Sequence, residues 1–391
     1  MNMKVTISDA VKFIGVDDKT IDLFESQYVV PEGVSYNSYL ILDEKVALMD
    51  TVDVRGMKEW EKNLTETLAG RKVDYLVIQH LEPDHAGSIG RLLELYPDVT
   101  LVGNAKTFAM LPQFFDIDPN VKKLTVAEGD TLSLGNHMLT FVMAPMVHWP
   151  EVMVPYESTE KILFSADGFG KFGALDSEDE EGWACEARRY YFNIVGKYGA
   201  PVQALLKKAA NLDIQTICPL HGPVLKENLG YYIGLYDTWS SYRPEDKGVL
   251  VAYASIHGNT AKAAEKFAEM LRAKGVEKVV VSDLAREDMA EVIEDAFRYD
   301  RMVVAGASYD GGVFPCMQDF LHHLQSKAYQ NRTVGIIENG SWGPTAGRTM
   351  KAILETMKNV TIVDPMVTIK SAMKESDMPA LEALADAIAN A

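Results

Sequence analysis

The sequence has few cysteines, and none stands at a spacing that binds metal or forms a redox pair. Its three cysteines, Cys185, Cys218 and Cys316, lie far apart, and no C-x-x-C motif occurs. A disulfide framework, a zinc ribbon, a rubredoxin-type iron site and an iron–sulfur cluster all need paired or closely spaced cysteines. The sequence therefore argues against all four and favours reduced thiols in a cytoplasmic protein.

Basic residues are also scarce: 38 Lys and Arg stand against 56 Asp and Glu, for a formal net charge of −18 at pH 7. Nucleic-acid binding and binding to anionic membranes both need a basic face, so we expect neither. No apolar run approaches the length of a membrane span. The N-terminus, M-N-M-K-V-T-I-S-D-A, lacks the features of a signal peptide.

The rest of the composition, with 47% hydrophobic and 24% charged residues, is typical of a globular protein. A chain of 391 residues is too long for one core, so we expect two domains. The clearest boundary is the polar stretch 242–248, Y-R-P-E-D-K-G, which precedes an apolar strand. We therefore place the first domain at 1–245 and the second at 248–391.

In the first domain, short strands alternate with helices. Residues 34–52 predict two strands around a turn at Asp43 and Glu44, and residues 73–79 predict another strand. Further strands are expected within 98–164, and an acidic loop at 174–182. The expected helices lie at 54–69, 86–96, 184–196 and 200–211.

In the second domain, strands and helices alternate strictly. Five strands alternating with helices predict a parallel, doubly wound sheet, which binds ligands at the carboxyl ends of its strands. The strands are expected at 248–254, 278–282, 301–305, 332–337 and 360–367. The helices are expected at 259–274, 287–298, 315–328, 344–358 and 376–390.

Possible metal ligands gather directly after the strand at 73–79. Four lie in the run H-L-E-P-D-H, and three more follow apolar strands further along the chain. All seven are nitrogen or oxygen donors, enough to hold two metal ions. They are His80, Glu82, Asp84, His85, His148, Asp167 and His221.

The run H-L-E-P-D-H could serve both ions. In an extended chain its alternate residues would face one way while His85 turned aside, so that its first two donors would bind one ion and its last two the other. His148 and His221 could complete the two sets. Two divalent ions about 3.5–4 Å apart repel strongly, and an anionic bridge from Asp167 would offset that repulsion.

Any one of these residues alone would usually be a surface or structural residue. Seven in this arrangement are not expected by chance. Of the other histidines, His137 lies in an expected turn and His322 and His323 on an expected helix. We interpret these three as structural or solvated.

A loop suited to phosphate joins an apolar strand to a helix at residues 255–260, S-I-H-G-N-T. Gly258 allows the backbone to curl, and Ser255, Asn259 and Thr260 supply short polar side chains. The helix N-terminus supplies amide donors, so no basic residue is needed. By contrast, G-F-G-K-F-G at 168–173 matches a dinucleotide fingerprint but precedes an acidic loop instead of a helix, so we do not expect nicotinamide binding there.

Two more loops follow strand ends, at 307–315 and 338–346. Trp342 is the best candidate to stack on a planar ring, and Tyr309 is the second. A domain with ordinary glycine turns would explain any one of the three loops, but poorly all three together. The candidate cofactor-binding residues are Ser255, Ile256, His257, Gly258, Asn259, Thr260, Ser308, Tyr309, Asp310, Gly311, Gly312, Asn339, Gly340, Ser341, Trp342 and Gly343.

These motifs resemble those of a known family. The order H-x-E-x-D-H, H-W-P, S-A-D and L-H-G-P over residues 1–245 resembles the metallo-β-lactamase fold and, more narrowly, flavodiiron proteins. Residues 248–391 resemble flavodoxins, which bind FMN. The resemblance implies an N-terminal metallo-β-lactamase-like αβ/βα sandwich followed by a flavodoxin-like, doubly wound parallel five-stranded sheet.

The resemblance also implies roles for the ligands. Two residues beside them, Trp149 and Tyr28, are candidates to influence substrate preference, and F-E-S-Q-Y stands where the family often has a pocket histidine. Hydrolytic members usually have histidine at the position of Glu82, and a carboxylate there suits iron better than zinc. The iron nearer the flavin would be bound by His80, Glu82 and His148, and the other by Asp84, His85 and His221, with Asp167 bridging.

By resemblance, the protein is an oxygen and/or nitric oxide reductase that takes electrons from FMN, with two domains and no attached rubredoxin or NAD(P)H-oxidising domain. Rubredoxin or a similar external donor would supply the electrons. A head-to-tail homodimer, or a dimer of dimers, would bring the flavin of one subunit to the irons of the other. Two alternatives are a zinc-dependent hydrolase fused to a flavodoxin module and a non-enzymatic electron carrier.

Overall fold

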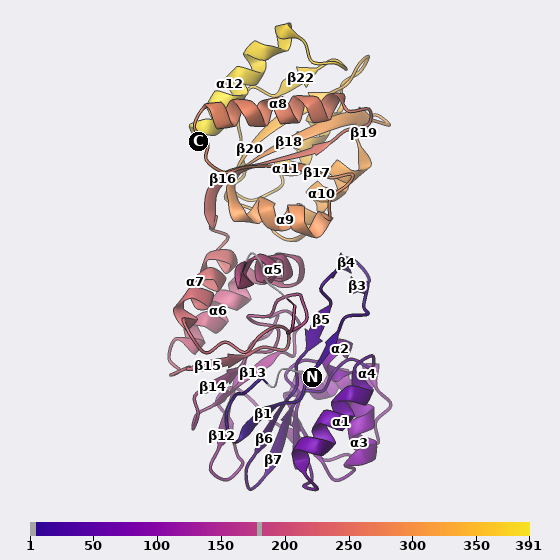
Figure 1. Ribbon diagram of the computed structural model, residues 1–391, viewed down its shortest axis with the longest axis vertical. Coiled ribbons are helices and arrows are strands. Elements are labelled where there is room, and N and C mark those ends of the chain that lie inside the picture. The colour runs from indigo at the N-terminus through magenta and orange to yellow at the C-terminus, as the bar shows by residue number, and fades with distance from the viewer. Residues whose placement is uncertain (1–4, 178–181) are drawn as a thin grey trace. The chain divides into compact units, whose positions relative to one another are not determined.

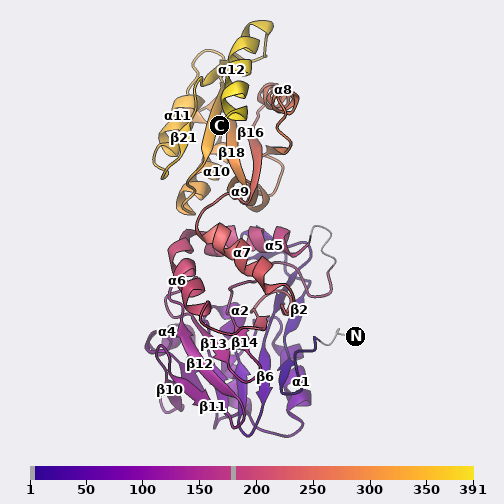
Figure 2. The same ribbon diagram turned by 90° about the vertical axis from the view of Figure 1, so that its left-hand side faces the viewer.

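The computed structural model describes residues 5–177 and 182–391, which form two compact units (Figures 1 and 2). The first unit comprises residues up to 191 together with 200–237, and the second comprises 192–199 and 238–391. This division differs from a single boundary at 242–248 because 192–199 packs with the second unit. There the ring of Phe192 stacks on that of Phe297, with 4.2 Å between centroids. None of the described helices is long and apolar enough to cross a membrane.

The first unit contains two mixed sheets and two short strand pairs. One sheet has the order β1 (Val11–Phe13), β6 (Tyr39–Leu42), β7 (Val46–Met49), β8 (Tyr75–Val77), β9 (Thr100–Gly103) and β10 (Lys123–Thr125). The other has the order β11 (Thr131–Ser133), β12 (Met138–Met143), β13 (Met153–Glu157), β14 (Ile162–Phe164) and β15 (Thr216–Cys218). The short pairs are β2 (Val16–Asp18) with β5 (Val34–Tyr36), and β3 (Leu23–Phe24) with β4 (Tyr28–Val29).

The two sheets bury their facing sides against each other. Tyr39 of β6 and Phe164 of β14, one from each sheet, meet edge to face with 5.6 Å between ring centroids. Because side chains alternate along a strand, this core sets the direction of the residues that follow each strand end. Other members of the core are Ile41, Met49, Val77, Val102, Leu139, Phe141, Met153, Ile162 and Cys218.

Helices lie on the outside of this sandwich. Figure 1 shows α1 (Met57–Leu68), α3 (Ile89–Leu95) and α4 (Ala105–Phe114) grouped on one side, and α6 (Gly199–Ala209) and α7 (Leu229–Ser240) on the other. The sequence did not predict α7, because L-G-Y-Y-I-G-L-Y has no distinct polar face. The acidic loop expected at 174–182 lies partly outside the described residues.

Two expected helices of the first unit are interrupted. In place of one helix at 86–96, α2 (Pro83–Ala86) and α3 are separated by Gly87 and Ser88. The helix expected at 184–196 is α5 (Trp183–Tyr190), followed by a π-helical turn (Tyr191–Val195) and a 3-10 turn (Gly196–Tyr198). The expected turn at Asp43 and Glu44 is confirmed, since β6 and β7 flank it.

His137 has the structural role expected of it. Its Nδ1 lies 2.7 Å from Oδ2 of Asp43, and its Nε2 lies 3.1 Å from Oε1 of Glu160. Burial alone would lower the pKa of His137, but these two carboxylates raise it above its usual range. The histidine thereby ties together the turns that follow β6, β11 and β13.

The second unit is built on a parallel sheet, as predicted. Its central order is β17 (Val279–Asp283), β16 (Asp246–Ala254), β18 (Tyr299–Tyr309) and β20 (Thr333–Asn339), with a short antiparallel β19 (Gly312–Val313) beside the end of β18. The single strand expected at 360–367 is wrong. β21 (Thr361–Ile362) and β22 (Val367–Ile369) pair with opposite ends of β20, and the chain leaves the sheet between them at Pro365, which has no N–H for the ladder.

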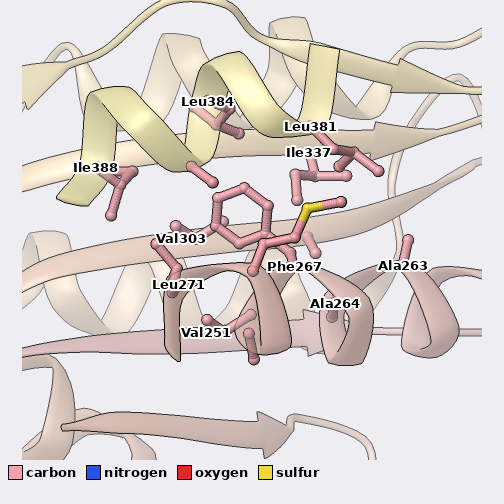
Figure 3. Packing of buried hydrophobic residues seen from close by; sticks show 14 of the residues in the cluster. Val251, Ala263, Ala264, Phe267, Leu271, Val303, Ile337, Leu381, Leu384 and Ile388 are labelled. Carbon is pink, nitrogen blue, oxygen red and sulfur yellow. The ribbon is translucent and has the colours of Figure 1, made fainter. Parts of the chain in front are cut away.

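Helices cover both faces of this sheet. Figures 1 and 2 show α8 (Asn259–Ala273) and α12 (Met378–Ala389) on one face, and α9 (Met289–Arg298), α10 (Pro315–Ser326) and α11 (Ala346–Leu354) on the other. A 3-10 turn (Glu375–Asp377) precedes α12. Figure 3 shows Phe267 of α8 among Val303, Ile337 and Leu384, which come from the sheet and α12. The carboxyl ends of β16, β18 and β20 are neighbours, so the three loops that follow them meet at one edge.

Candidate functional site

The ligand run H-L-E-P-D-H changes conformation in its middle. His80 follows β8, Glu82 is the N-cap of α2, and Pro83 occupies the first turn of that helix. The expectation that the run is extended as far as Asp84 is therefore wrong, because Pro83 has the φ angle that starts a helix. The helical turn separates the last two donors of the run from the first two.

The remaining three donors follow strands of the second sheet of the first unit. His148 lies in the loop between β12 and β13, Asp167 follows β14, and His221 follows β15. All three are buried. The glycines of G-F-G-K-F-G form the loop after Asp167, where the Gly170 N–H donates to the Asp167 carbonyl over 3.0 Å.

The seven residues come together as two donor sets that share Asp167. The first donor set is His80, Glu82 and His148, and the second donor set is Asp84, His85 and His221.

In the first donor set, Nε2 of His80 and Nε2 of His148 each lie 3.1 Å from Oε2 of Glu82. The same two nitrogens lie 3.4 and 3.2 Å from Oδ2 of Asp167. These atoms therefore surround one small volume.

In the second donor set, Nε2 of His221 and Nε2 of His85 lie 3.1 and 3.3 Å from Oδ2 of Asp84. Nε2 of His85 also lies 3.1 Å from Oδ1 of Asp167. Asp167 thus presents one oxygen to each donor set, as a bridging carboxylate would.

Many of these atoms are buried without a hydrogen-bond partner, although they lie close together. This holds for both carboxylate oxygens of Asp84 and of Asp167, both ring nitrogens of His85 and Nε2 of His221. Buried polar atoms in proteins are normally hydrogen-bonded. Unpartnered donor atoms of Asp84, His85, Asp167 and His221 that converge in this way are the arrangement that cations require, so the residues fit a two-metal site.

The charges of the cluster support one another. Burial alone would lower the pKa of His148, but Asp167 and Glu82 raise it to about 9. Burial alone would raise the pKa of Asp167, but His80 and His85 hold it well below its usual range. Asp167 is therefore held as an anion deep in the first unit.

Two further contacts orient the histidines. Nδ1 of His80 lies 2.9 Å from Oε1 of the buried Glu151, and Nδ1 of His221 lies 2.7 Å from the carbonyl oxygen of Ser35. An N–H donated from Nδ1 leaves the Nε2 lone pair facing the centre. The sequence interpretation missed Glu151, although it lies three residues after His148 in H-W-P-E.

A buried network joins the two ligand loops from behind. Asp50, at the end of β7, accepts hydrogen bonds from the Gln79 backbone N–H (2.9 Å) and side chain (2.6 Å). The side-chain oxygen Oε1 of Gln79 in turn accepts from the Ala166 N–H over 3.2 Å. This network sets the positions of the residues next to Gln79 and Ala166, namely His80 and Asp167. No spacing rule in the sequence points to it.

Aromatic rings border the donors. Trp149 meets the His80 ring at 5.0 Å between centroids, and Phe24 and Tyr190 each lie 5.4 Å from the His221 ring. The ring of Tyr28 lies 6.2 Å from that of Phe172, between centroids. The sequence interpretation missed Tyr190.

Glu25 occupies the stretch where the family often has a histidine. It lies in the turn between β3 and β4, with φ of +47°, and its carboxyl group contacts Glu82. Burial and the neighbouring Glu82 raise the pKa of Glu25 to about 7.

In the second unit, the N-terminus of α8 is a helix end suited to an anion. Gly258 is its N-cap with φ of +85°, and no side chain caps the helix. By contrast, Asp288 caps α9, and Glu338 accepts the Gly347 N–H in the first turn of α11 over 2.7 Å. The first-turn N–H groups of α8 therefore face the loop 255–260, in which Ser255 Oγ accepts the Gly258 N–H over 3.0 Å.

The three candidate loops expose apolar side chains at one edge of the sheet. Ile256 is 41% exposed, Tyr309 45% and Trp342 98%. Ser308 and Asn339 differ, because their side chains bond to other parts of the protein: Ser308 Oγ accepts from Thr345, and Asn339 pairs with Ser371. Such exposed rings beside an open helix N-terminus suit a planar cofactor that carries a phosphate.

The remaining candidate residues lie on the same loops. They are His257, Asn259 and Thr260 beside Gly258; Asp310 and Gly311 in the β18–β19 turn, with Gly312 at the start of β19; and Gly340, Ser341 and Gly343 beside Trp342.

Fold and site together define a class: a metallo-β-lactamase-like metal unit followed by a flavodoxin-like unit. Family models agree, since residues 34–222 match the ODP family beta lactamase and residues 250–363 match a flavodoxin domain. The chain is 30% identical to a nitric oxide reductase of Moorella thermoacetica over 387 residues, which are 97% of this chain and 96% of that protein.

Solved structures show the same architecture over the whole chain. The rubredoxin oxygen:oxidoreductase of Desulfovibrio gigas matches with a TM-score of 0.93 and 26% identity, covering 99% of this chain and 98% of that one. The flavodiiron protein of Giardia intestinalis shares the fold, with a TM-score of 0.89, 24% identity, and coverage of 100% and 97%. This chain belongs to the flavodiiron protein family.

The contact between Glu151 and His80 leads to a prediction about metal affinity. Glu151→Gln removes the charge that makes the His80 ring a better ligand, so Fe(II) affinity should fall roughly 10-fold, at the lower end of the range for such partners. Anaerobic competition with a chromophoric chelator measures this. The matched control is Glu157→Gln, which changes a buried carboxylate of β13. This carboxylate accepts hydrogen bonds from the N–H groups of Thr159 and Glu160 and is not in contact with either metal-donor set. Equal Fe(II) affinity in the two variants would refute the role.

Proposed function

We propose that this protein reduces O₂, NO or both, with electrons that reach a di-iron centre from FMN. The observation that carries the proposal is Asp167, which offers one oxygen to each of two donor sets in a chain that also holds a flavodoxin-like unit. The first donor set would hold one iron and the second donor set the other. The reductase names of the relatives support the same reaction class.

Two ferrous ions and a reduced FMN, when bound, supply up to four electrons: four with four protons convert O₂ to two waters, and two with two protons convert two NO to N₂O and one water. The residues of the chain provide the setting. Asp167 would offset the repulsion between the two cations, and Glu82 would add a hard anionic ligand that suits iron. Trp149, Phe24 and Tyr190 keep bulk water away from the donors.

The N-terminus of α8 would hold the phosphate of FMN. Its open N–H groups and the left-handed Gly258 allow the backbone to wrap around an anion without a basic side chain. Trp342 and Tyr309 would stack against the flavin ring, which would cover side chains that are otherwise exposed.

We further propose a head-to-tail homodimer, or a dimer of dimers, in which the flavin of one subunit serves the irons of the other. Exposed apolar residues near the donors support this: Leu23 and Val29 flank the β3–β4 turn, and Phe114 packs on Trp149. The flavin loops expose a second apolar set, which such pairing would cover. We place the protein in the cytoplasm, with rubredoxin or a similar carrier as donor; the three cysteines, all within the described residues, form no disulfide.

A zinc hydrolase fused to a flavodoxin module is the less favoured reading. Glu82 lies within the first donor set, where its carboxylate favours iron, and the relatives reported above carry reductase names.

Metal content and Asp167 test the di-iron proposal. Protein purified without oxygen should hold about two irons per chain and consume O₂ or NO when supplied with reduced donor. Asp167→Asn leaves one carbonyl oxygen where two anionic oxygens are needed, so the variant should lose at least one iron. Its activity should fall by more than the roughly 10- to 100-fold expected when a residue that only hydrogen-bonds to a ligand is changed. FMN content should not change. Two zincs without iron, from cells grown with ample iron, would refute the proposal.

A matched glycine pair tests the phosphate site. Gly258 and Gly275 have φ of +85° and +87°, and a Cβ added at either meets nothing within 4 Å. Alanine at each should therefore cost a similar stability, about 1 kcal/mol. Only Gly258→Ala should weaken FMN binding, by at least roughly 10-fold, because its methyl group would enter the phosphate position. Titration of apoprotein with FMN, followed by flavin fluorescence, measures this. Equal FMN affinity in the two variants would place the phosphate elsewhere.

Light scattering after size-exclusion chromatography tests the assembly. The active species should have twice or four times the mass of one chain. Leu23→Asp and Val29→Asp together should shift it towards monomer and slow electron transfer to the irons, with FMN binding unchanged. A fully active wild-type monomer would contradict the proposed dimer.

A further inference from the structure

In the flavin loop, residues 340–346, the backbone has to hold the Trp342 ring in place. Its Trp342 is 98% exposed, so side-chain packing within the subunit does not hold the indole in place. The position of the ring then depends on the loop backbone. If the backbone is anchored, a planar cofactor meets a preformed stacking partner. If it is not, binding must order the loop at an entropic cost.

The two ends of the flavin loop are held close together. A Cβ on Gly340 would lie 2.8 Å from Cα of Pro344 and 2.8 Å from Oγ of Ser308, so only glycine fits there. Ser308 Oγ accepts the N–H groups of Thr345 (2.9 Å) and Ala346 (3.1 Å). These contacts tie the flavin loop to the loop that carries Tyr309.

The end of β20 carries two polar residues that point in different directions. Glu338 accepts from the Gly347 N–H (2.7 Å) and from the Thr368 hydroxyl (2.8 Å), which holds the far end of the flavin loop. The next residue, Asn339, is buried and bonds to Ser371 in the loop after β22.

The Asn339 carboxamide makes a reciprocal pair with the backbone of Ser371. Its Nδ2 donates to the Ser371 carbonyl over 2.9 Å, and its Oδ1 accepts the Ser371 N–H over 2.9 Å. The Gly340 N–H donates to the Ile369 carbonyl over 3.0 Å directly beside this pair. Both ends of the amide are thus engaged with the backbone of a neighbouring loop.

We propose that Asn339 is a positioning residue for the flavin: its paired hydrogen bonds to Ser371 lock the flavin loop to the end of β22 and the residues just after it, and so hold Trp342 at the cofactor. This inference rests on the proposed FMN site. Asparagine suits the position because it offers one donor and one acceptor at this length. Aspartate has the same shape but sets an anionic oxygen against the Ser371 carbonyl, and alanine lacks both groups.

The test measures the FMN dissociation constant of apoprotein for wild type, Asn339→Asp and Asn339→Ala. Both variants should bind FMN about 10-fold more weakly, since each breaks buried hydrogen bonds that preorganise the loop. The visible circular dichroism of bound FMN, which reports the asymmetric stacking of its ring, should weaken in both. Measured well below the melting transition, these signals separate positioning from a mere loss of stability.

Asn359→Asp is the control. Asn359 donates to Asn331 over 3.0 Å at the opposite edge of the same sheet. The FMN affinity and dichroism of the Asn359→Asp variant should therefore equal those of wild type. A second control is Ser371→Gly, which keeps both backbone partners and should also bind FMN normally. If wild type binds FMN and both Asn339 variants have FMN dissociation constants within twofold of the wild-type value, the positioning role is overturned while the proposed function stands. If wild type itself does not bind FMN, the proposed function fails and the inference fails with it.

Discussion

The first unit is organised around one buried anion, Asp167. Taking a carboxylate out of water is costly unless cations or hydrogen-bond donors surround it. Asp167 is 1% exposed, and its two oxygens face different donor sets, with ring nitrogens 3.1–3.4 Å away. A single residue can serve two sites only if both approach it from opposite sides. This requirement explains why the ligand run turns from extended to helical at Pro83, and why the other donors come from a second sheet.

Holding such a centre depends on the core between the two sheets and on polar contacts behind the ligands. β14 and β15 are parallel neighbours, so Asp167 and His221 leave the sheet at the same edge. His80 comes from the facing sheet. The Asp50–Gln79–Ala166 network bridges the two sheets at this level, and Glu151 and Ser35 set the rings of the histidines. The donors are thus placed by strand ends and then aimed by buried hydrogen bonds.

Much of this organisation could be predicted from the sequence. The parts that could not be predicted have one cause in common: they do not depend on a local pattern of residues. The donors of H-x-E-x-D-H and the β-α-β rhythm are local patterns, and the structure brings the seven donors together. The extended run was mispredicted because Pro83 both fits a turn and starts a helix. Glu151, Asp50 and Tyr190 escaped notice because single buried polar or aromatic residues follow no spacing rule. The strand expected at 360–367 failed at Pro365, where the pattern of apolar residues continues but the backbone cannot pair.

The two units solve the problem of preorganisation in different ways. At the metal centre the functional atoms are side-chain atoms, so buried partners such as Glu151 can aim each of them directly. At the loops proposed to bind the flavin, the groups that would act are backbone N–H groups and the exposed indole of Trp342, whose positions are set by the backbone. The backbone must therefore be fixed at its ends, by Gly340 against Pro344, by Ser308 and Glu338, and by the Asn339 pair. An exposed tryptophan on a firmly anchored loop is consistent with a surface that remains open until a cofactor covers it.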